Sequence, residues 1–282
     1  MTSLARSLLQ REFAFGTEDF EALRALVKSL TGINLSDQKR ELVYGRLSRR
    51  LRALRLTSFH EYRKLLAGNP QELVQLTNAV TTNLTAFFRE RHHFDYLRDA
   101  VLKPLAADAH ASRRVRIWSA GCSTGEEPYS IAMTVLEAVP DLTRWDIRIL
   151  ATDLDSDVLA RARAGIYAAE RMRGIDPDRL AQFFTERRAG AAMSYQVVPE
   201  LAALITFKQL NLMHNLPMKG PLDAIFCRNT VIYFDKDTQR DLFSRMAVLQ
   251  HPGNRLFLGH SESLFQVSTD YTLIGKTIYR RD

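Results

Sequence analysis

The chain has 282 residues, of which 46% are hydrophobic and 25% charged, a composition that is ordinary for a globular protein and unlike that of a disordered chain. Its apolar runs are far shorter than the roughly 20 residues that cross a bilayer, and its first residues lack a signal-peptide run, so we predict a cytoplasmic protein without direct membrane insertion. Cys122 and Cys227 are too few for a disulfide framework, whereas the net charge of +7 fits an anionic partner such as nucleic acid, lipid headgroups or an acidic protein surface.

Residues 1–84 predict an all-helical N-terminal domain. Apolar side chains recur at helical spacing over residues 17–33, where a glycine supplies the helix stop. Two later helices begin at predicted caps, because Ser58 stands three residues before Glu61 and Asn69 directly precedes a proline. Short helices joined by short turns predict a small bundle.

A strongly basic segment, residues 39–55, lies inside this domain and is predicted to form a helix capped by Ser36. Arg46, Arg49 and Arg50 fall on one flank of that helix, spread over roughly 100° beside its leucine stripe. A solvated charged face is one interpretation of this flank, and a docking surface for an acidic partner is the other.

Residues 85–113 predict a linker and a connecting helix, after which strands alternate with helices to the end of the chain. Predicted strands lie at 115–121, 146–155, 222–229 and 255–260, and predicted helices at 126–139, 156–165 and 236–253. This alternation predicts an α/β fold with a doubly wound, mostly parallel sheet over residues 114–282. Residues 176–207 break the pattern and predict an inserted antiparallel β subdomain.

The first predicted strand leads into the turn SAGCSTGEEP, at the sheet edge where open α/β sheets bind ligands. Gly121 and Gly125 allow a close backbone approach there, while Glu126 and Glu127 at the next helix N-terminus would repel a pyrophosphate. Asp153, which ends the second strand, can accept hydrogen bonds from a ribose. These residues favour a nucleoside ligand that is cationic or lacks phosphate, such as S-adenosylmethionine, over NAD, and a plain strand-to-helix turn is the alternative.

Histidines do not predict a metal site. His92 and His93 are adjacent, so on a helix they point about 100° apart, and no carboxylate or cysteine at helical spacing completes a ligand set. We therefore predict no metal, and we expect His260 to have a structural role at the end of a strand.

Four motifs behind the basic helical domain resemble the CheR family of chemotaxis receptor methyltransferases, and the resemblance runs from about Phe20 to the C-terminus. The motifs are TTNLTAFFRE at 81–90, WSAGCSTGEEPYSIA at 118–132, FCRNTVIYFD at 226–235 and GHSES at 259–263. The resemblance implies a class I methyltransferase domain over 114–282. It also implies that the methyl group of S-adenosylmethionine is transferred to glutamate side chains on the cytoplasmic part of chemoreceptors, in sensory adaptation, with S-adenosylhomocysteine as the product.

The same resemblance implies a set of site residues. The implied cofactor contacts are Asn83, Thr85, Arg89, Gly121, Glu127, Asp153, Asn211, Leu212, Arg228 and Asn229. Arg89 and Tyr233 are implied nearest the reacting carboxylate, with a surface salt bridge and a strand aromatic as the alternatives. A glutamate is already ionised near neutral pH, so no general base is required, and Arg89 is expected to orient the nucleophile or to serve the cofactor carboxylate. Thr230 departs from the family, which commonly has valine there.

Partners follow from the resemblance too. With the resemblance accepted, the basic flank of Arg46, Arg49 and Arg50 is expected to dock on the acidic methylation regions of a chemoreceptor. Some members of the family dock a receptor C-terminal peptide at the edge of the inserted sheet. Residues 187–192 fit such an edge and equally a plain hairpin.

Two other functions stay open. A nucleic-acid methyltransferase would explain the basic charge, but those that methylate base amines usually carry a PPY-type loop where this chain has CRNTVIYFD, so we expect no nucleic-acid partner. The second alternative is a non-catalytic domain that senses S-adenosylmethionine and docks on a partner.

Overall fold

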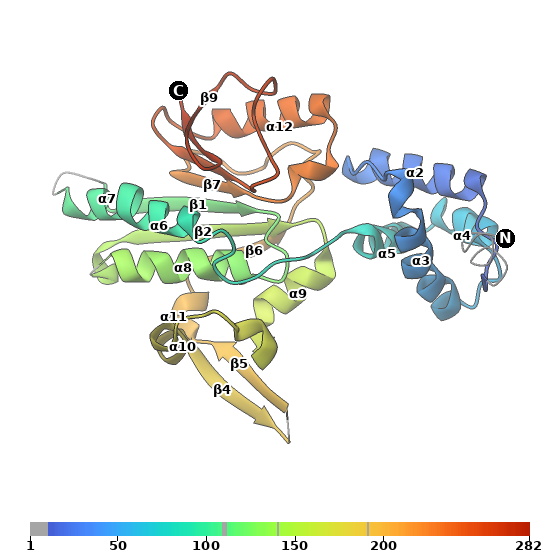
Figure 1. Cartoon of the computed structure of the whole chain (residues 1–282), viewed down its shortest axis with the longest axis horizontal. Coiled ribbons are helices and arrows are strands. Elements are labelled where there is room, and N and C mark those ends of the chain that lie inside the picture. Colours follow the sequence, from blue (N-terminus) through green and yellow to red (C-terminus); the bar gives the residue numbers. More distant parts are fainter. Residues whose placement is uncertain (1–10, 109–111, 140, 191) are drawn as a thin grey trace, which may run out of the picture. The chain divides into compact units, whose positions relative to one another are not determined.

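The computed structural model describes residues 11–108, 112–139, 141–190 and 192–282. The chain divides into two compact units, each described here by itself (Figure 1). The helical unit comprises Met1–Thr82 and Tyr233–Asp235, and the sheet unit comprises Asn83–Ile232 and Lys236–Asp282. The start of the predicted 1–84 domain, and three positions of the predicted 85–113 linker, lie outside the described residues.

The helical unit confirms the predicted small helical domain. Its α-helices among the described residues are α2 (Thr17–Thr31), α3 (Arg40–Leu54), α4 (Phe59–Leu66) and α5 (Pro70–Val80). The Ser58 and Asn69 side chains cap α4 and α5, as predicted, by accepting hydrogen bonds from the backbone N–H groups of Glu61 and Glu72. The cap predicted at Ser36 is wrong, because a short turn, η2 (Asp37–Lys39), intervenes before α3 and no side-chain cap bond forms.

The sheet unit is built on a seven-stranded, mostly parallel sheet of order β6-β2-β1-β7-β8-β10-β9. The strands are β1 (Arg114–Ala120), β2 (Asp146–Asp153), β6 (Ile205–Gln209), β7 (Ala224–Cys227), β8 (Arg255–Leu258), β9 (Tyr271–Gly275) and β10 (Ile278–Arg281). Only β10 runs antiparallel to the rest, because it pairs antiparallel with both β8 and β9. Because the strand order reverses at β1, the ends of β1, β2 and β7 meet at a switch point, where open α/β sheets bind ligands.

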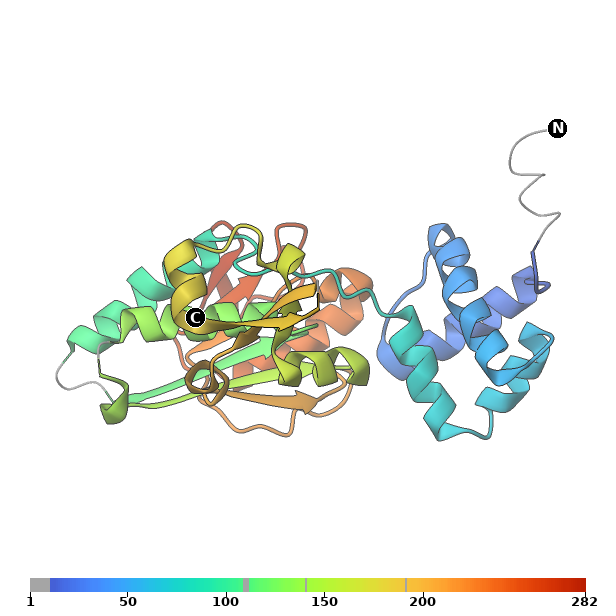
Figure 2. The same cartoon turned by 90° about the horizontal axis from the view of Figure 1, so that it is seen from below.

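Helices cover both faces of this sheet (Figures 1 and 2). The segment of α6 (His92–Tyr96), η3 (Leu97–Leu102) and α7 (Lys103–Ala107) lies beside α8 (Glu126–Ala138) on one face, and α12 (Lys236–Val248) covers the other. Helix α9 (Ser156–Ala164) follows β2. The rings of Phe226 and Phe257 stack with their centroids 4.2 Å apart inside the sheet unit. Burying such large apolar side chains contributes roughly 1.5–3 kcal/mol each, which fixes the strand ends that carry the site.

A separate antiparallel sheet, the small sheet, has the order β3-β5-β4. Its strands are β3 (Ile166–Ala168), β4 (Phe184–Ala189) and β5 (Ala192–Val197), flanked by α10 (Pro177–Phe183) and α11 (Pro199–Ala202). This confirms the predicted antiparallel sheet, although its strand β3 precedes residues 176–207. The prediction was wrong for residues 205–207, which belong to β6 and pair parallel with β2 in the main sheet. Within the described residues, every helix is too short or too polar to cross a bilayer.

Candidate active site

The turn after β1, residues 121–125, is held against the sheet by backbone hydrogen bonds and is called the cofactor loop below. The N–H groups of Gly121 and Cys122 both donate to the Thr152 carbonyl, at 2.8 and 2.9 Å. Gly121 has φ of 91°, and a Cβ there would lie 2.2 Å from the Thr230 hydroxyl, so glycine is required. Thr230, the departure from the family pattern, donates to the Ala120 carbonyl at 3.2 Å and so fixes the turn after β7 against the cofactor loop.

Asp153 ends β2 and lies against the cofactor loop. One carboxylate oxygen accepts from the Ser123 N–H at 2.8 Å and the other from the Asp155 N–H at 3.0 Å. Burial raises the pKa of Asp153 to about 6, although these backbone donors act in the opposite direction. Each oxygen keeps a second lone pair, so the carboxylate can also accept hydroxyl donors such as those of a ribose.

The linker motif meets the same loop through Asn83. Its side-chain amide donates to the Asp155 carboxylate at 2.8 Å, and its backbone carbonyl accepts from the Ser123 hydroxyl at 3.0 Å. Sequence positions 83, 123 and 155 therefore converge at the carboxyl end of the sheet. Thr85 lies half-buried in the same linker.

Arg228 joins the buried carboxylate of Glu127 to the partly buried carboxylate of Glu90. Its guanidinium donates to Glu127 at 3.0 Å, lies 3.4 Å from Glu90, and also donates to the Arg89 carbonyl. Glu127 further accepts from the Ser119 hydroxyl at 2.7 Å. Burial raises the pKa of Glu127, and the charge of Arg228 opposes that rise. Glu127 and Arg228 therefore support each other beneath the loop.

Glu262, which the sequence analysis did not single out, organises the turn after β7. Its carboxylate is buried and accepts hydrogen bonds from several backbone N–H groups at 2.7–2.9 Å. These donors are Gly259, Asn229, Thr230 and Val231. The carboxylate allows Asn229 to hold its φ of 58°. The signal in the sequence was the acidic residue inside the GHSES motif.

The structure also places four other predicted cofactor contacts. Asn211 follows β6, and its side-chain oxygen accepts from the Met213 N–H at 3.0 Å. Leu212 is buried beside it. Arg89 is half-buried and donates to the Leu84 carbonyl at 2.9 Å, while Asn229 is fixed by Glu262.

Tyr233 belongs to the helical unit, whereas Arg89 belongs to the sheet unit. The Lys39 ammonium lies 4.2 Å from the centroid of the Tyr233 ring, and the Tyr233 carbonyl accepts from the Asn34 N–H at 2.8 Å. The joint catalytic role of Arg89 and Tyr233 therefore stays a prediction.

Two of the three arginines on the basic flank of α3 contact α5, and the third is exposed. Arg50 forms two hydrogen bonds, at 2.7 and 2.6 Å, with Glu72, whose buried carboxylate also accepts from the Tyr62 hydroxyl. Arg46 donates to the Ala79 carbonyl at 3.1 Å, near the end of α5. Both arginines thus join α3 to α5, while Arg49 is exposed.

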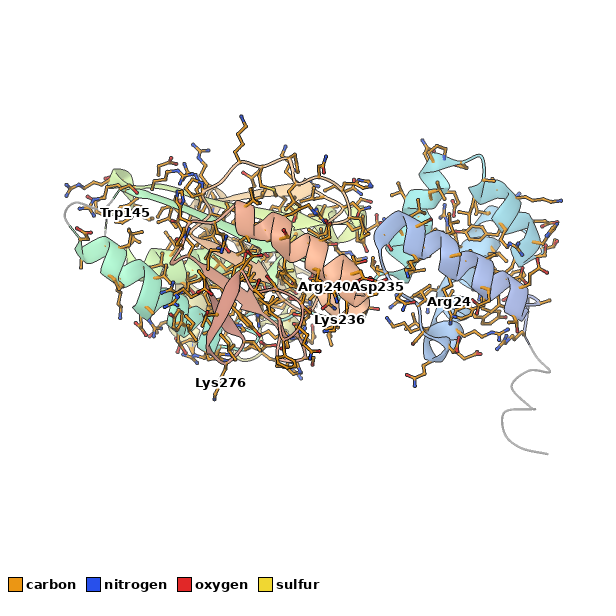
Figure 3. The ribbon with its side chains drawn as sticks, turned by 90° about the horizontal axis from the view of Figure 1, so that it is seen from above. Arg24, Trp145, Asp235, Lys236, Arg240 and Lys276 are labelled. Atoms are coloured by element: carbon orange, nitrogen blue, oxygen red, sulfur yellow. The ribbon has the colours of Figure 1, made fainter. Side chains whose placement is uncertain are left out.

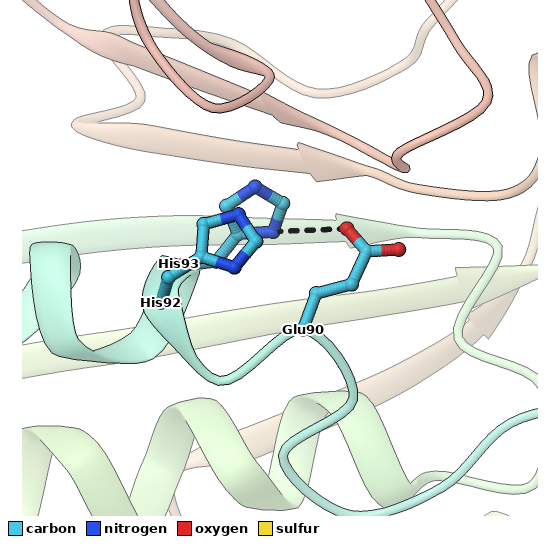
Figure 4. A group of neighbouring side chains, drawn as sticks. All are labelled: Glu90, His92 and His93. Carbon is cyan, nitrogen blue, oxygen red and sulfur yellow. Dashed lines mark ion pairs between the residues drawn. The ribbon is translucent and has the colours of Figure 1, made fainter.

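Glu90, His92 and His93 form a cluster whose possible ligand atoms all lie within 4.8 Å of one another (Figure 4). The imidazole centroids are 4.2 Å apart, so the expectation that these rings diverge is wrong. Burial and the charge of Arg228 lower the pKa of His93 to about 3.

Glu90, His92 and His93 contact other groups of the protein in a way that indicates a structural role. Burial alone would raise the pKa of Glu90, but the hydrogen bond from His260 at 2.9 Å and the charge of Arg228 lower it to about 2. Both histidines contact the Lys276 carbonyl through Nε2, while the Lys276 side chain points outward (Figure 3). Because the guanidinium beside Glu90 opposes a second cation, we assign no metal here, and the predicted absence of a metal stays a prediction.

Comparisons with known proteins match nearly the whole chain. The family model described as "CheR methyltransferase, SAM binding domain" matches residues 83–280, and "CheR methyltransferase, all-alpha domain" matches residues 18–81. The chain is 46% identical to chemotaxis protein methyltransferase 2 of Pseudomonas aeruginosa, over 95% of each chain. It is 42% identical to the chemotaxis protein methyltransferase of Escherichia coli, over 99% of this chain and 95% of that protein.

Proposed function

Because the chain belongs to the CheR methyltransferase family, and therefore uses S-adenosylmethionine, we propose that it methylates glutamate side chains on the cytoplasmic part of chemoreceptors. The observation that carries the proposal is the match of both family domains in order, at 42–46% identity to named chemotaxis methyltransferases. The buried carboxylates at the carboxyl edge of the sheet support it, because they suit a ribose and a cationic centre. The product would be S-adenosylhomocysteine and a glutamate methyl ester.

The cofactor would be held by the residues around the cofactor loop. Asp153 would accept the ribose hydroxyls, and Glu127, braced by Arg228, would supply negative charge toward the cationic part of the ligand. Asn83, Thr85, Asn211, Leu212 and Asn229 would close the pocket around them. Gly121 keeps the loop backbone free of side-chain atoms on the side of Thr230.

The reaction asks the protein chiefly for positioning. When bound, S-adenosylmethionine supplies an electrophilic methyl group. A receptor glutamate is ionised near neutral pH, so the chain has to align and partly desolvate its carboxylate rather than remove a proton. We assign Arg89 to this alignment, and the role of Tyr233 stays a prediction from the family resemblance. Arg89 must hold the carboxylate loosely, because the negative charge disappears on transfer and a tight ion pair would favour the ground state.

The proposal is tested by methyl transfer from tritiated S-adenosylmethionine to membranes that contain chemoreceptors of the same organism, followed by mild alkali. Release of label as volatile methanol is the expected result, because carboxyl methyl esters hydrolyse in alkali. Cofactor binding without transfer would point to a sensor. Alkali-stable label in nucleic acid, with salt-sensitive retention on DNA, would point to the other methyltransferase class.

We expect Arg49→Glu to lower the rate of receptor methylation roughly fivefold at low receptor concentration, since an exposed charge contributes about 1 kcal/mol to docking. The affinity for S-adenosylhomocysteine, measured by calorimetry, should not change. Arg46 and Arg50 are unsuitable for this test because both join α3 to α5. Lys219→Glu, which changes the net charge equally at an exposed position of the sheet unit, is the control and should methylate normally. Equal loss in both variants would refute docking through α3.

We extend the proposal to a receptor C-terminal peptide at the small sheet. In the strand order β3-β5-β4, β4 has β5 on one side within the described residues, so its outer edge can accept an added strand. Calorimetric titration with peptides from receptor C-termini tests this. Absence of binding by every such peptide would remove this docking mode while leaving the methyltransferase proposal intact.

Cofactor affinity is expected to depend on the protonation of Asp153. Its pKa of about 6 means that acidification below pH 6 protonates the carboxyl group and removes the acceptor that we assign to the ribose. The dissociation constant for S-adenosylhomocysteine should therefore rise as pH falls from 7 to 5, by up to about tenfold per pH unit below the pKa. Calorimetry across pH 5–8 measures it. Asp153→Asn should bind weakly with a flat profile, and a flat wild-type profile would contradict the assignment.

A further inference from the structure

The segment that leads into the small sheet reaches back to the cofactor loop. We call residues 166–172, which comprise β3 and η5 (Ala169–Met172), the bridge segment. The Tyr167 hydroxyl donates to the Thr124 carbonyl at 2.8 Å, and the Arg171 guanidinium forms an ion pair with Glu126. The bridge segment therefore holds both the loop and the first residue of α8.

These contacts lie where burial and close packing restrict the cofactor loop. The Glu126 side chain is 0% exposed, and its other carboxylate oxygen accepts from the Thr124 hydroxyl at 2.6 Å. A Cβ on Gly125 would lie 2.8 Å from the Tyr167 hydroxyl, so the ring packs directly against the loop backbone. Removing Arg171 would leave a buried carboxylate without its cation, a change that forces local rearrangement.

The bridge segment is also part of the small sheet. Tyr167 on β3 pairs in register with Tyr195 on β5, which in turn pairs with Glu186 on β4. The Phe87 ring contacts Tyr167 and Phe184, with centroids 4.9 and 5.5 Å away. A displacement of β4 or β5 is therefore transmitted to Tyr167 through packed rings and ladder hydrogen bonds.

We propose that Arg171 and Tyr167 are positioning residues of the cofactor loop, which couple the small sheet energetically to cofactor binding. The proposal rests on the cofactor role proposed above for residues 121–127. Because coupling between two sites is reciprocal, cofactor binding stabilises the small sheet to the same extent that an ordered small sheet favours cofactor binding. Couplings of this kind typically change affinities about 5- to 150-fold.

The first test is Arg171→Met, for which we expect the dissociation constant of S-adenosylhomocysteine, measured by calorimetry on the full chain, to rise about tenfold. Arg171→Lys, which keeps the charge, should recover part of the affinity. The matched control is Arg179→Met, because Arg179 on α10 pairs with Glu137 at the opposite end of α8, at 2.6 Å. The affinity of Arg179→Met for S-adenosylhomocysteine should stay within about twofold of that of the wild type. Equal affinity of Arg171→Met and wild type would overturn the proposal.

The second test uses hydrogen exchange with and without S-adenosylhomocysteine. We expect the ligand to slow exchange of β4 and β5 amides in the wild type, and this protection to be lost in Arg171→Met. If Arg171→Met does not fold, Tyr167→Phe removes a single hydroxyl donor and should weaken both ligand binding and small-sheet protection. Protection confined to residues 121–127 in the wild type would overturn the coupling. Absence of protection at residues 121–127 would instead refute the cofactor role that we propose for these residues. Neither measurement depends on whether chemoreceptors are the methyl acceptors.

Discussion

Replacing Glu262 by glutamine is expected to lower the unfolding free energy of the sheet unit by about 3 kcal/mol, which corresponds to a melting temperature about 6–12 °C lower. Both carboxylate oxygens of Glu262 accept hydrogen bonds from the backbone. Oε1 accepts from Thr230 and Val231, and Oε2 accepts from Asn229 and Gly259. A glutamine supplies one oxygen, so its amide group would face at least two N–H donors and leave them without an acceptor in a buried turn.

The loss of melting temperature should be much larger for the buried Glu262 than for an exposed glutamate. Glu200→Gln is the matched control, because Glu200 is exposed on α11 and its replacement should shift the melting temperature by less than about 2 °C. Thermal unfolding followed by near-ultraviolet circular dichroism measures both variants. Since Glu262 fixes the turn that carries Asn229, cofactor affinity should fall as well. Melting of Glu262→Gln at the wild-type temperature would show that water replaces the lost acceptor.

Strands β1, β2, β7 and β8 of the main sheet could be predicted because each is a local run of apolar residues, whereas β6 was assigned to the insertion and β9 and β10 were not predicted. Strand β1 is a run of mostly buried residues that ends at a glycine turn, and the structure places it within one residue of the predicted limits. Strand β3 could not be predicted, because Ile166–Ala168 is too short to show an alternating pattern and pairs only with residues far along the chain. Its pairing with β5 explains why the small sheet extends beyond residues 176–207.

Site residues could be predicted where they lie directly at the end of a predicted strand. Gly121 and Asp153 belong to this class, and both lie at the carboxyl edge of the sheet. Arg171 was missed because its partner Glu126 is distant in sequence and leaves no local pattern. Glu262 was missed because most of its donors lie about 30 residues away, although the GHSES motif contains it. The helical wheel placed Arg50 on a charged flank but could not reveal the buried Glu72 on α5, so it could not separate a structural arginine from one free to dock.

Replacing Arg228 by methionine is expected to be the most damaging single change in the site, lowering the unfolding free energy of the sheet unit by about 3–5 kcal/mol. The substitution keeps an apolar stem of similar length but removes the cation between Glu127 and Glu90. The buried Glu127 and the partly buried Glu90 would then lack this charged partner, and the affinity for S-adenosylhomocysteine should fall with the stability. Arg228→Lys should recover part of the loss, because an ammonium keeps the charge but not the fork that reaches both acids.

A double-mutant cycle shows whether the interaction with Glu127 carries this loss. Glu127→Gln removes one unpaired charge, so Arg228→Met combined with Glu127→Gln should be less destabilised than the sum of the single changes, by about 1–3 kcal/mol in urea unfolding. Without Arg228, the native pKa values of both acids should rise above those in the unfolded chain. The native state of Arg228→Met then binds more protons than the unfolded state, so its deficit relative to wild type should grow as pH rises from 5 to 8. Additive single changes with a pH-independent deficit would instead place the loss in the bond to the Arg89 carbonyl and in packing against Phe94.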